Sequence, residues 1–379
     1  MSGYLPQEVL FNIFLDLPPK TLVLCSCVSK SWRSVIASPT FFTAHLNQSL
    51  TCNRKLLILR RYYGNRSKQE VRYSLHFDTE TLDLYQELKF PFVNRNGDFK
   101  IVGFCNGLVC FLGLDLLLWN PSIQRAVVVP RTSDILTIYG VPDYYALGFG
   151  FDSRANDYKV VRLLYFEDKT PFIYKRSPKV EVYEVTKGSW RGIENKAPRC
   201  EIIKSGWTQA FVDGVVHWIA YREIGRGYRC FILRFDIVEE CFNTIALPEC
   251  LVNSSPYDLK VAVLGGALSI MLCGWYCFET YMSSVWVLQK YDIPESWTKL
   301  ISFDRSQELG MVLGLRENGE MLMESKRGEV VLYKPEIQIM KGLGIYGTEG
   351  TFYLNTYVES LALLNEGKGI SEKVAEVYD

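Results

Sequence analysis

Few side chains of this sequence are of types that could act in catalysis or bind a metal ion, and their spacing matches no catalytic or metal-binding site. The 3 histidines are His45, His76 and His217, and none has cysteine or aspartate at the spacing of an activated nucleophile or a metal site. The run Gly342–Gly347 has the GxGxxG form of a phosphate loop, but Thr351–Leu354 after it predicts a strand, whereas such a loop leads into a helix. We therefore expect structural histidines and no phosphate site.

The 11 cysteines also lack the spacing of a metal site. No CxxC pair occurs, and no second pair answers Cys273 and Cys277, which are four positions apart. The odd count, with no signal-peptide pattern at the N-terminus, predicts reduced thiols that pack as small hydrophobic side chains. We expect no catalytic residues, no metal, no cofactor and no enzymatic activity.

Composition limits the kinds of partner. Lys+Arg and Asp+Glu both number 42, so the net charge is zero and there is no basic footprint for nucleic acid or an anionic membrane. Hydrophobic residues make up 48% and charged residues 22%, as in ordinary soluble domains. No run of about 18 apolar residues occurs. We expect a cytoplasmic and/or nuclear protein.

The elements that carry these residues are strands from about residue 55 onward. Short runs of alternating β-branched and aromatic residues are separated by two-residue turn pairs that tolerate positive φ angles. The pairs are Asn106-Gly107, Asn156-Asp157, Asp213-Gly214, Gly265-Gly266 and Asn318-Gly319, whose second members lie 50, 57, 52 and 53 residues apart. A repeat of that length with several strands predicts the blades of a β-propeller. A second element, a polar turn followed by an apolar strand, occurs in six copies, from Phe77–Pro91 to a weaker copy at Tyr333–Met340, and predicts six blades. A β-sandwich with internal duplication is the alternative.

The ends of the repeat region should meet. We expect the last strand, Tyr357–Leu364, to complete the first blade, which starts near Lys55, and so to close the ring.

Long connections in the third, fourth and fifth repeats predict a binding face. Between successive turns these repeats are longer than the others, and we assign the extra residues to loops after the second strand of each blade, joined by the link 138–145. Tyr, Trp and Arg, which anchor protein interfaces, are frequent there. Packing of the same aromatics onto the blades is the alternative for any one residue. The predicted substrate-binding residues are Tyr139, Tyr144, Phe172, Tyr174, Tyr221, Arg222, Arg226, Tyr228, Trp275, Tyr276 and Tyr281.

The first 50 residues have a different, helical pattern. Val9, Ile13 and Leu17 recur on one helical face, Pro18-Pro19 ends that helix, and Val28 and Trp32 belong to a second apolar stripe. Short helices of this total length cannot bury all of that surface by themselves. A partner should cover part of it.

The segment Leu5–Leu46 resembles an F-box, the motif through which substrate receptors dock on the Skp1 subunit of SCF ubiquitin ligases. The matching pieces are Leu5-Pro6, Val9-Leu10, Ile13-Phe14, Leu17-Pro18, Cys27–Arg33, Ser38-Pro39 and His45-Leu46. A helical cap that packs only on its own protein is the alternative. The resemblance implies Skp1-binding residues Leu5, Pro6, Val9, Ile13, Leu17, Pro18, Leu22, Val28 and Trp32.

The rest of the chain resembles the F-box-associated, kelch-like domain of plant F-box proteins, which include S-locus pollen proteins and regulators of immune-receptor abundance. The pieces include Gly103–Cys110, Leu118–Ser122, Gly148–Asp152, Asp157–Arg162, Ser189–Arg191 and Ser296–Lys299. The resemblance implies a six-bladed kelch-like β-propeller over residues 55–365 and an F-box over 1–50. Residues 366–379 are charged and lack periodicity, which predicts a disordered tail.

The resemblance implies a substrate-recognition subunit of an SCF-type ligase. Its partners would be a Skp1-like protein, cullin and RING subunits and an unidentified protein substrate, with no nucleic acid and no membrane. The alternatives are an enzyme on a propeller scaffold, and a Skp1-bound scaffold or glycan-binding module without ligase function. A bound metal in the pure protein would favour the first, and glycan-array binding the second.

Overall fold

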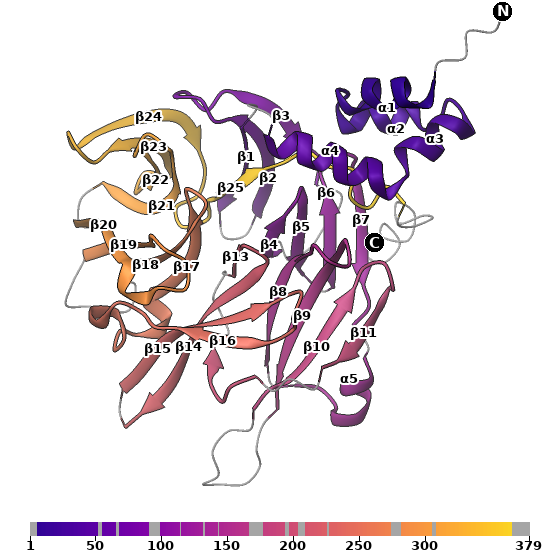
Figure 1. Ribbon diagram of the computed structural model, residues 1–379. Coiled ribbons are helices and arrows are strands. Elements are labelled where there is room, and N and C mark those ends of the chain that lie inside the picture. The colour runs from indigo at the N-terminus through magenta and orange to yellow at the C-terminus, as the bar shows by residue number, and fades with distance from the viewer. Residues whose placement is uncertain are drawn as a thin grey trace, which may run out of the picture. The chain divides into compact units, whose positions relative to one another are not determined.

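The computed structural model describes residues 6–51, 55–65, 68–90, 99–113, 115–131, 133–142, 144–166, 177–193, 197–203, 209–225, 227–273, 282–304 and 308–365. Four helices come first, and strands make up most of the remaining chain (Figure 1). The predicted class, mainly β with N-terminal helices, is confirmed.

The N-terminal helices are α1 (Gln7–Leu15), α2 (Pro19–Cys25), α3 (Lys30–Ile36) and α4 (Pro39–Thr51). Helix α2 begins at Pro19, where the N–H that proline lacks would have no partner within the helix. The Ser29 hydroxyl accepts a hydrogen bond from the Trp32 N–H (3.1 Å) and caps α3. The Ser38 hydroxyl accepts one from the Phe41 N–H (3.2 Å) at the start of α4.

The described strands form six antiparallel sheets, which are the blades of a six-bladed β-propeller. The first blade contains β1 (Leu56–Asn65), β2 (Lys68–Phe77), β3 (Leu84–Leu88) and β25 (Tyr353–Tyr357). The second contains β4 (Lys100–Cys105), β5 (Leu108–Leu112), β6 (Leu116–Asn120) and β7 (Arg125–Val129). The third contains β8 (Tyr144–Asp152), β9 (Asp157–Tyr165), β10 (Lys179–Glu184) and β11 (Ser189–Gly192).

The fourth blade contains β12 (Glu201–Ile202), β13 (Ala210–Val212), β14 (Val215–Ile224), β15 (Gly227–Asp236) and β16 (Phe242–Ile245). The fifth contains β17 (Leu259–Leu264), β18 (Ala267–Leu272), β19 (Met282–Leu288) and β20 (Trp297–Asp304). The sixth contains β21 (Leu309–Leu315), β22 (Met321–Ser325), β23 (Glu329–Lys334) and β24 (Ile339–Tyr346). Short helices α5 (Asp134–Tyr139), η1 (Glu249–Leu251), η2 (Pro256–Asp258) and η3 (Pro294–Ser296) lie in connections.

The five predicted turn pairs lie between the first two hairpin strands of blades two to six. Asn106 and Gly107 have φ angles of 46° and 81°, and Asp213 and Gly214 have 50° and 81°. Both residues of these two pairs, and both of Gly265-Gly266, therefore occupy the left-handed region that a tight hairpin requires, whereas in the other two pairs only Asn156 and Gly319 do. The predicted number of six blades is confirmed.

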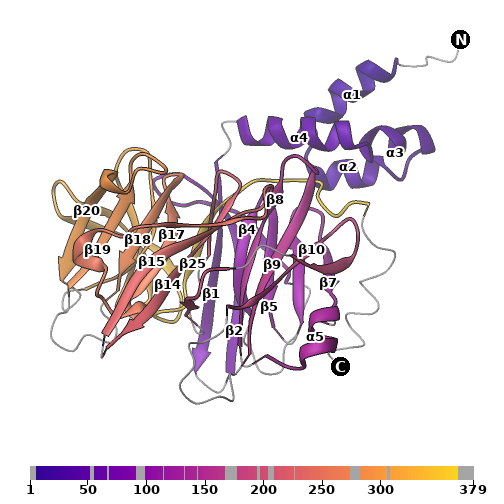
Figure 2. The same ribbon diagram turned by 60° about the horizontal axis from the view of Figure 1, so that its bottom comes forward.

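The first blade combines both ends of the β region. Strand β25 pairs with β1 in antiparallel register, from Arg60 opposite Tyr353 to Leu56 opposite Tyr357 (Figure 2). The prediction that a C-terminal strand completes the first blade is confirmed, but its predicted bounds, Tyr357–Leu364, were wrong. The strand ends at Tyr357, and the residues after it contact Asn120 and the N-terminal helices instead of a neighbouring strand.

Residues 358–365 form a segment that we call the strap, and the side chain of Asn120 holds it. Asn120 is fully buried, and its amide donates hydrogen bonds to the Ser360 carbonyl (3.0 Å) and the Ala362 carbonyl (2.8 Å). Its side-chain oxygen accepts one from the Ser122 N–H (2.9 Å). A Cβ at Gly107 would lie 2.4 Å from the Val358 carbonyl oxygen, so the hairpin at the start of the second blade must carry glycine.

The strap also supports the helices. Leu361 and Leu364 of the strap, with Ile123 of the second blade, complete an apolar core whose other members come from the helices. The helical members are Phe14, Leu22, Val35, Ile36 and Phe41. The Asn365 amide donates to the Ala37 carbonyl (2.9 Å) at the end of α3. The apolar residues of 358–364, which the sequence predicted as part of a strand, therefore pack against helices α1 to α4. We call these four helices, residues 7–51, the helical module.

By contacts the chain divides into two compact units. The first comprises Met1–Phe99, Phe104–Val129 and Thr351–Asp379, and the second comprises Lys100–Gly103 and Pro130–Gly350. Within the second unit, separate apolar cores join the third blade to the fourth, the fourth to the fifth and the fifth to the sixth.

We predict that Asn120→Ala destabilises the first unit. The change leaves two strap carbonyls without their donor, at a cost of about 3 kcal/mol, which corresponds to a fall in melting temperature of about 4 °C for a chain of this length. Differential scanning fluorimetry measures it. The matched control is Asn253→Ala, because Asn253 is exposed. Equal melting temperatures for the two variants would show that Asn120 does not hold the strap.

Candidate functional site

Five large apolar side chains of the helical module are exposed to solvent, and one of them, Leu50 (53%), lies near the end of α4. Val9 (41% exposed) and Ile13 (47%) are one turn apart on α1. Leu24 (67%) lies near the end of α2, and Val28 (65%) follows one turn later. So much exposed apolar surface on one small module is typical of a protein-interaction site.

The predicted docking residues divide between this surface and the core beneath it. Pro6, Val9, Ile13, Pro18 and Val28 are exposed, and Leu17 and Trp32 are partly buried. Leu22 is fully buried, and Trp32 packs edge-on against Phe14 with 5.1 Å between ring centroids. Leu5 lies outside the described residues. Sequence reasoning missed Leu24, although its spacing of four from Val28 was a usable signal.

The predicted substrate face contains a group of tyrosines from the third and fourth blades. Tyr144 and Tyr165 are paired across β8 and β9, and their rings stack 4.3 Å apart. Tyr221 and Tyr228 meet edge-to-face at 5.4 Å. Burial raises the pKa of Tyr221, and the neighbouring Tyr257 and Tyr144 raise it further. These contacts bring the described tyrosines of the face together, mainly by packing against one another.

The prediction of a long loop at 221–228 was wrong. Strand β14 continues to Ile224 and pairs with β15 from Gly227, so only two residues separate the two strands. Tyr221 is 6% exposed and belongs to the core between the fourth and fifth blades. Its predicted role on the substrate surface is therefore corrected to packing. The extra residues of this repeat lengthen a hairpin, because alternating residues such as these continue a strand as readily as they form a loop.

The other predicted substrate residues have different positions. Arg222 is exposed on β14, Tyr228 is partly buried, and Tyr139 ends α5. Phe172, Tyr174, Arg226, Trp275, Tyr276 and Tyr281 lie outside the described residues, so their roles remain predictions.

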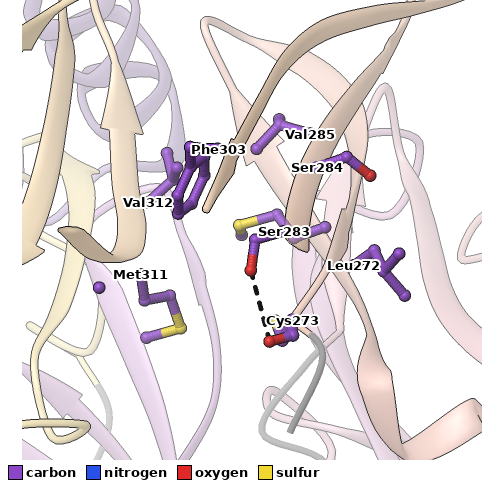
Figure 3. Close-up of a pocket in the computed structure, with 10 residues that line it drawn as sticks. Leu272, Cys273, Ser283, Ser284, Val285, Phe303, Met311 and Val312 are labelled. Carbon is purple, nitrogen blue, oxygen red and sulfur yellow. Dashed lines mark hydrogen bonds between the residues drawn. The ribbon is translucent and has the colours of Figure 1, made fainter. Parts of the chain in front are cut away.

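A small pocket in the second unit is mainly apolar. Met271, Phe303 and Val312 are among the side chains that line it, and Ser283 donates a hydrogen bond to the Cys273 carbonyl at 3.4 Å (Figure 3). A ligand site would need several polar groups directed at the same point. This pocket is better explained as a gap in strand packing.

The histidines occupy buried structural positions. His217 bonds through its ring nitrogens to the Ala210 carbonyl (3.2 Å) and the Tyr291 hydroxyl (2.6 Å). His76 bonds to the Leu82 carbonyl (2.7 Å), and His45 to the Leu17 carbonyl (3.1 Å). Each ring thus satisfies a backbone acceptor. In the described part of the chain, no three His, Cys, Asp or Glu side chains are placed to hold a metal ion.

No helix among the described residues has the length and apolar character needed to cross a membrane.

Comparison with known proteins agrees with this two-part organisation. Residues 4–43 match the F-box domain, and residues 69–355 match the F-box associated beta propeller domain. The chain is 28% identical to "F-box protein CPR1" of Arabidopsis thaliana, covering 95% of this chain and 89% of the relative. It is 26% identical to "F-box protein At3g07870" of the same plant, covering 94% and 91%. It is also similar to the solved structure "YCF48 bound to D1 peptide", with 10% identity, a TM-score of 0.39 and coverage of 82% of this chain and 97% of that one.

An N-terminal helical module with an apolar surface, followed by a six-bladed propeller, defines the class of this protein. The chain belongs to the F-box proteins that carry an F-box associated β-propeller domain, and it is similar to plant members of that family.

We predict that acid destabilises the protein partly through His217. Burial lowers the pKa of His217 to about 4, and also lowers the pKa of His45 and of His76. An unfolded histidine has a pKa of about 6.5. The unfolded chain therefore takes up protons first, so the contribution to stability is complete above about pH 6.5 and is lost as the pH falls towards 4.

The measurement is the melting temperature from pH 7.5 to 4.5 for the wild type and for His217→Gln. The variant should melt earlier at pH 7.5 but lose less between the two limits. Identical pH dependence in the two proteins would show that His217 does not contribute to acid sensitivity.

Proposed function

We propose that this protein is the substrate-recognition subunit of an SCF-type ubiquitin ligase. The helices dock on a Skp1-like subunit, which connects them to cullin and RING subunits, and the propeller recruits a protein for ubiquitination and degradation. The observation that carries this proposal is the exposure of Val9, Ile13, Leu24 and Val28 within or beside helices that match the F-box domain.

On this proposal the chain acts by positioning rather than by reactive groups, since transfer chemistry belongs to other subunits. The packing of Ile123, Leu361 and Leu364 against the helices supports such a role. It fixes the docking helices to the first two blades without a flexible joint.

We also propose that the protein works in the cytoplasm or the nucleus. The described cysteines, among them the buried Cys105, Cys110 and Cys230, are all free thiols. Free thiols fit a reducing compartment.

Proteins that co-purify with the chain only when the proteasome is inhibited would be substrate candidates.

We predict that the double variant Ile13→Asp and Val28→Asp weakens binding to a Skp1-like protein by about tenfold or more, because it places carboxylates in the centre of an apolar interface. Both side chains are exposed, so the melting temperature should stay close to that of the wild type. Isothermal titration of the purified full chain with the Skp1-like protein measures the affinity.

Asn47→Asp is the matched control, because Asn47 is polar and exposed on α4 and also gains a negative charge. It should bind like the wild type. If the double variant keeps wild-type affinity, the proposed docking surface is wrong. If the double variant melts much earlier, these side chains are core, and the affinity of Leu24→Asp decides the question.

A further inference from the structure

Three arginines gather at the end of the hairpin β14–β15 in the fourth blade. Arg222 of β14 and Arg229 of β15 are directly opposite in the register of the pair. The Nε of Arg222 donates a hydrogen bond to the carbonyl of Arg199 (3.1 Å), which precedes β12. All three side chains are exposed. We call Arg199, Arg222 and Arg229 the arginine cluster.

No carboxylate in the described part of the chain forms an ion pair with any member of the cluster. Other arginines of the same unit behave differently. Arg154 pairs with Glu239, Arg191 with Glu184 and Glu240, and Arg234 with Asp292. An overall basic composition does not explain the cluster, because the whole sequence has 42 basic and 42 acidic residues.

The opposed positions of Arg222 and Arg229 raise the free energy of the unbound protein. Side chains directly opposite in an antiparallel pair start about 5 Å apart, and like charges in those positions repel. Arg222 is held in place, because its guanidinium also lies 5.1 Å from the centre of the Phe231 ring. An anionic partner would relieve the repulsion. Arginine binds carboxylates well, since its planar fork can donate two parallel hydrogen bonds.

The surroundings favour a protein ligand over a nucleic acid. Four of the described aromatic residues nearby are already paired, since Tyr144 stacks on Tyr165 and Tyr221 contacts Tyr228, so these four offer no open stacking platform. Ile224, 57% exposed at the tip of the hairpin, adds an apolar contact beside the charges. Charged and apolar side chains together suit a segment of polypeptide.

We propose that the arginine cluster binds an acidic segment, rich in Glu or Asp, of the protein that the propeller recruits. This inference rests on the proposed function and adds the chemical class of the substrate. Arg222 and Arg229 contact the carboxylates, and Arg199 extends the positive surface beside them.

The probe is a fluorescein-labelled peptide of about ten alternating Glu and Gly residues, with a peptide carrying Gln in place of Glu as its neutral match. Fluorescence anisotropy is measured on the full chain bound to its Skp1-like partner at about 50 and 200 mM salt. The Debye length is longer than about 10 Å at the lower concentration and shorter at the higher one. We expect binding of the Glu peptide, weakening with salt, and much weaker binding of the Gln peptide.

The test variant is R222E/R229E, which should weaken binding of the Glu peptide by about tenfold or more. R222K/R229K keeps the charges and should retain most of the affinity. The control K326E/K341E makes the same change in net charge at two exposed lysines of the sixth blade and should bind like the wild type.

Equal affinity for the two peptides overturns the inference, as does an equal loss in R222E/R229E and K326E/K341E. Tighter binding of a single-stranded oligo-dT than of the Glu peptide also overturns it, in favour of nucleic acid. Failure of the proposed function is distinguishable, because it appears as a chain that binds no Skp1-like partner. Failure of this inference leaves that binding intact.

Discussion

The pairing of β25 with β1 is the contact on which the rest of the architecture depends. It brings residues 293 to 301 positions apart, from Arg60 with Tyr353 to Leu56 with Tyr357, into one sheet, so the first blade forms only when both ends of the β region are in place. Arg60 of β1 reinforces the closure, because its guanidinium donates to the Thr351 carbonyl (3.2 Å) just before β25. Closure also covers an edge of β1 that would otherwise be open to other chains.

The strap links the closed first blade to the helical module. Once β25 is fixed, the chain passes Asn120 and delivers Leu361 and Leu364 to the helices. Burying these leucines leaves other apolar side chains, such as Ile13 and Val28, on the outer surface. The helices therefore have two sides with different tasks, one anchored to their own chain and one available to a partner.

Features with local chemical causes could be predicted from the sequence, and features set by long-range packing could not. The turn at Asp213-Gly214 requires positive φ angles, so its residue types were enough to identify it. The strap could not be distinguished from a strand, because an apolar run looks the same in either role until its partner is known. The length of a repeat likewise does not show whether extra residues form a loop, as expected for 221–228, or a longer hairpin.

The period of two in a strand explains why the predicted substrate face proved partly core and partly surface. Tyr221 and Cys230 are opposite each other and point into the core shared with the fifth blade. Arg222 and Arg229, one position along on each strand, point to the other side, beyond Ala220 and Phe231, which pack on the third blade. Because the hairpin extends past the end of that core, its last residues on this side meet solvent. The same alternation that buries a tyrosine thus exposes the arginines, and a binding surface can change here without altering the core.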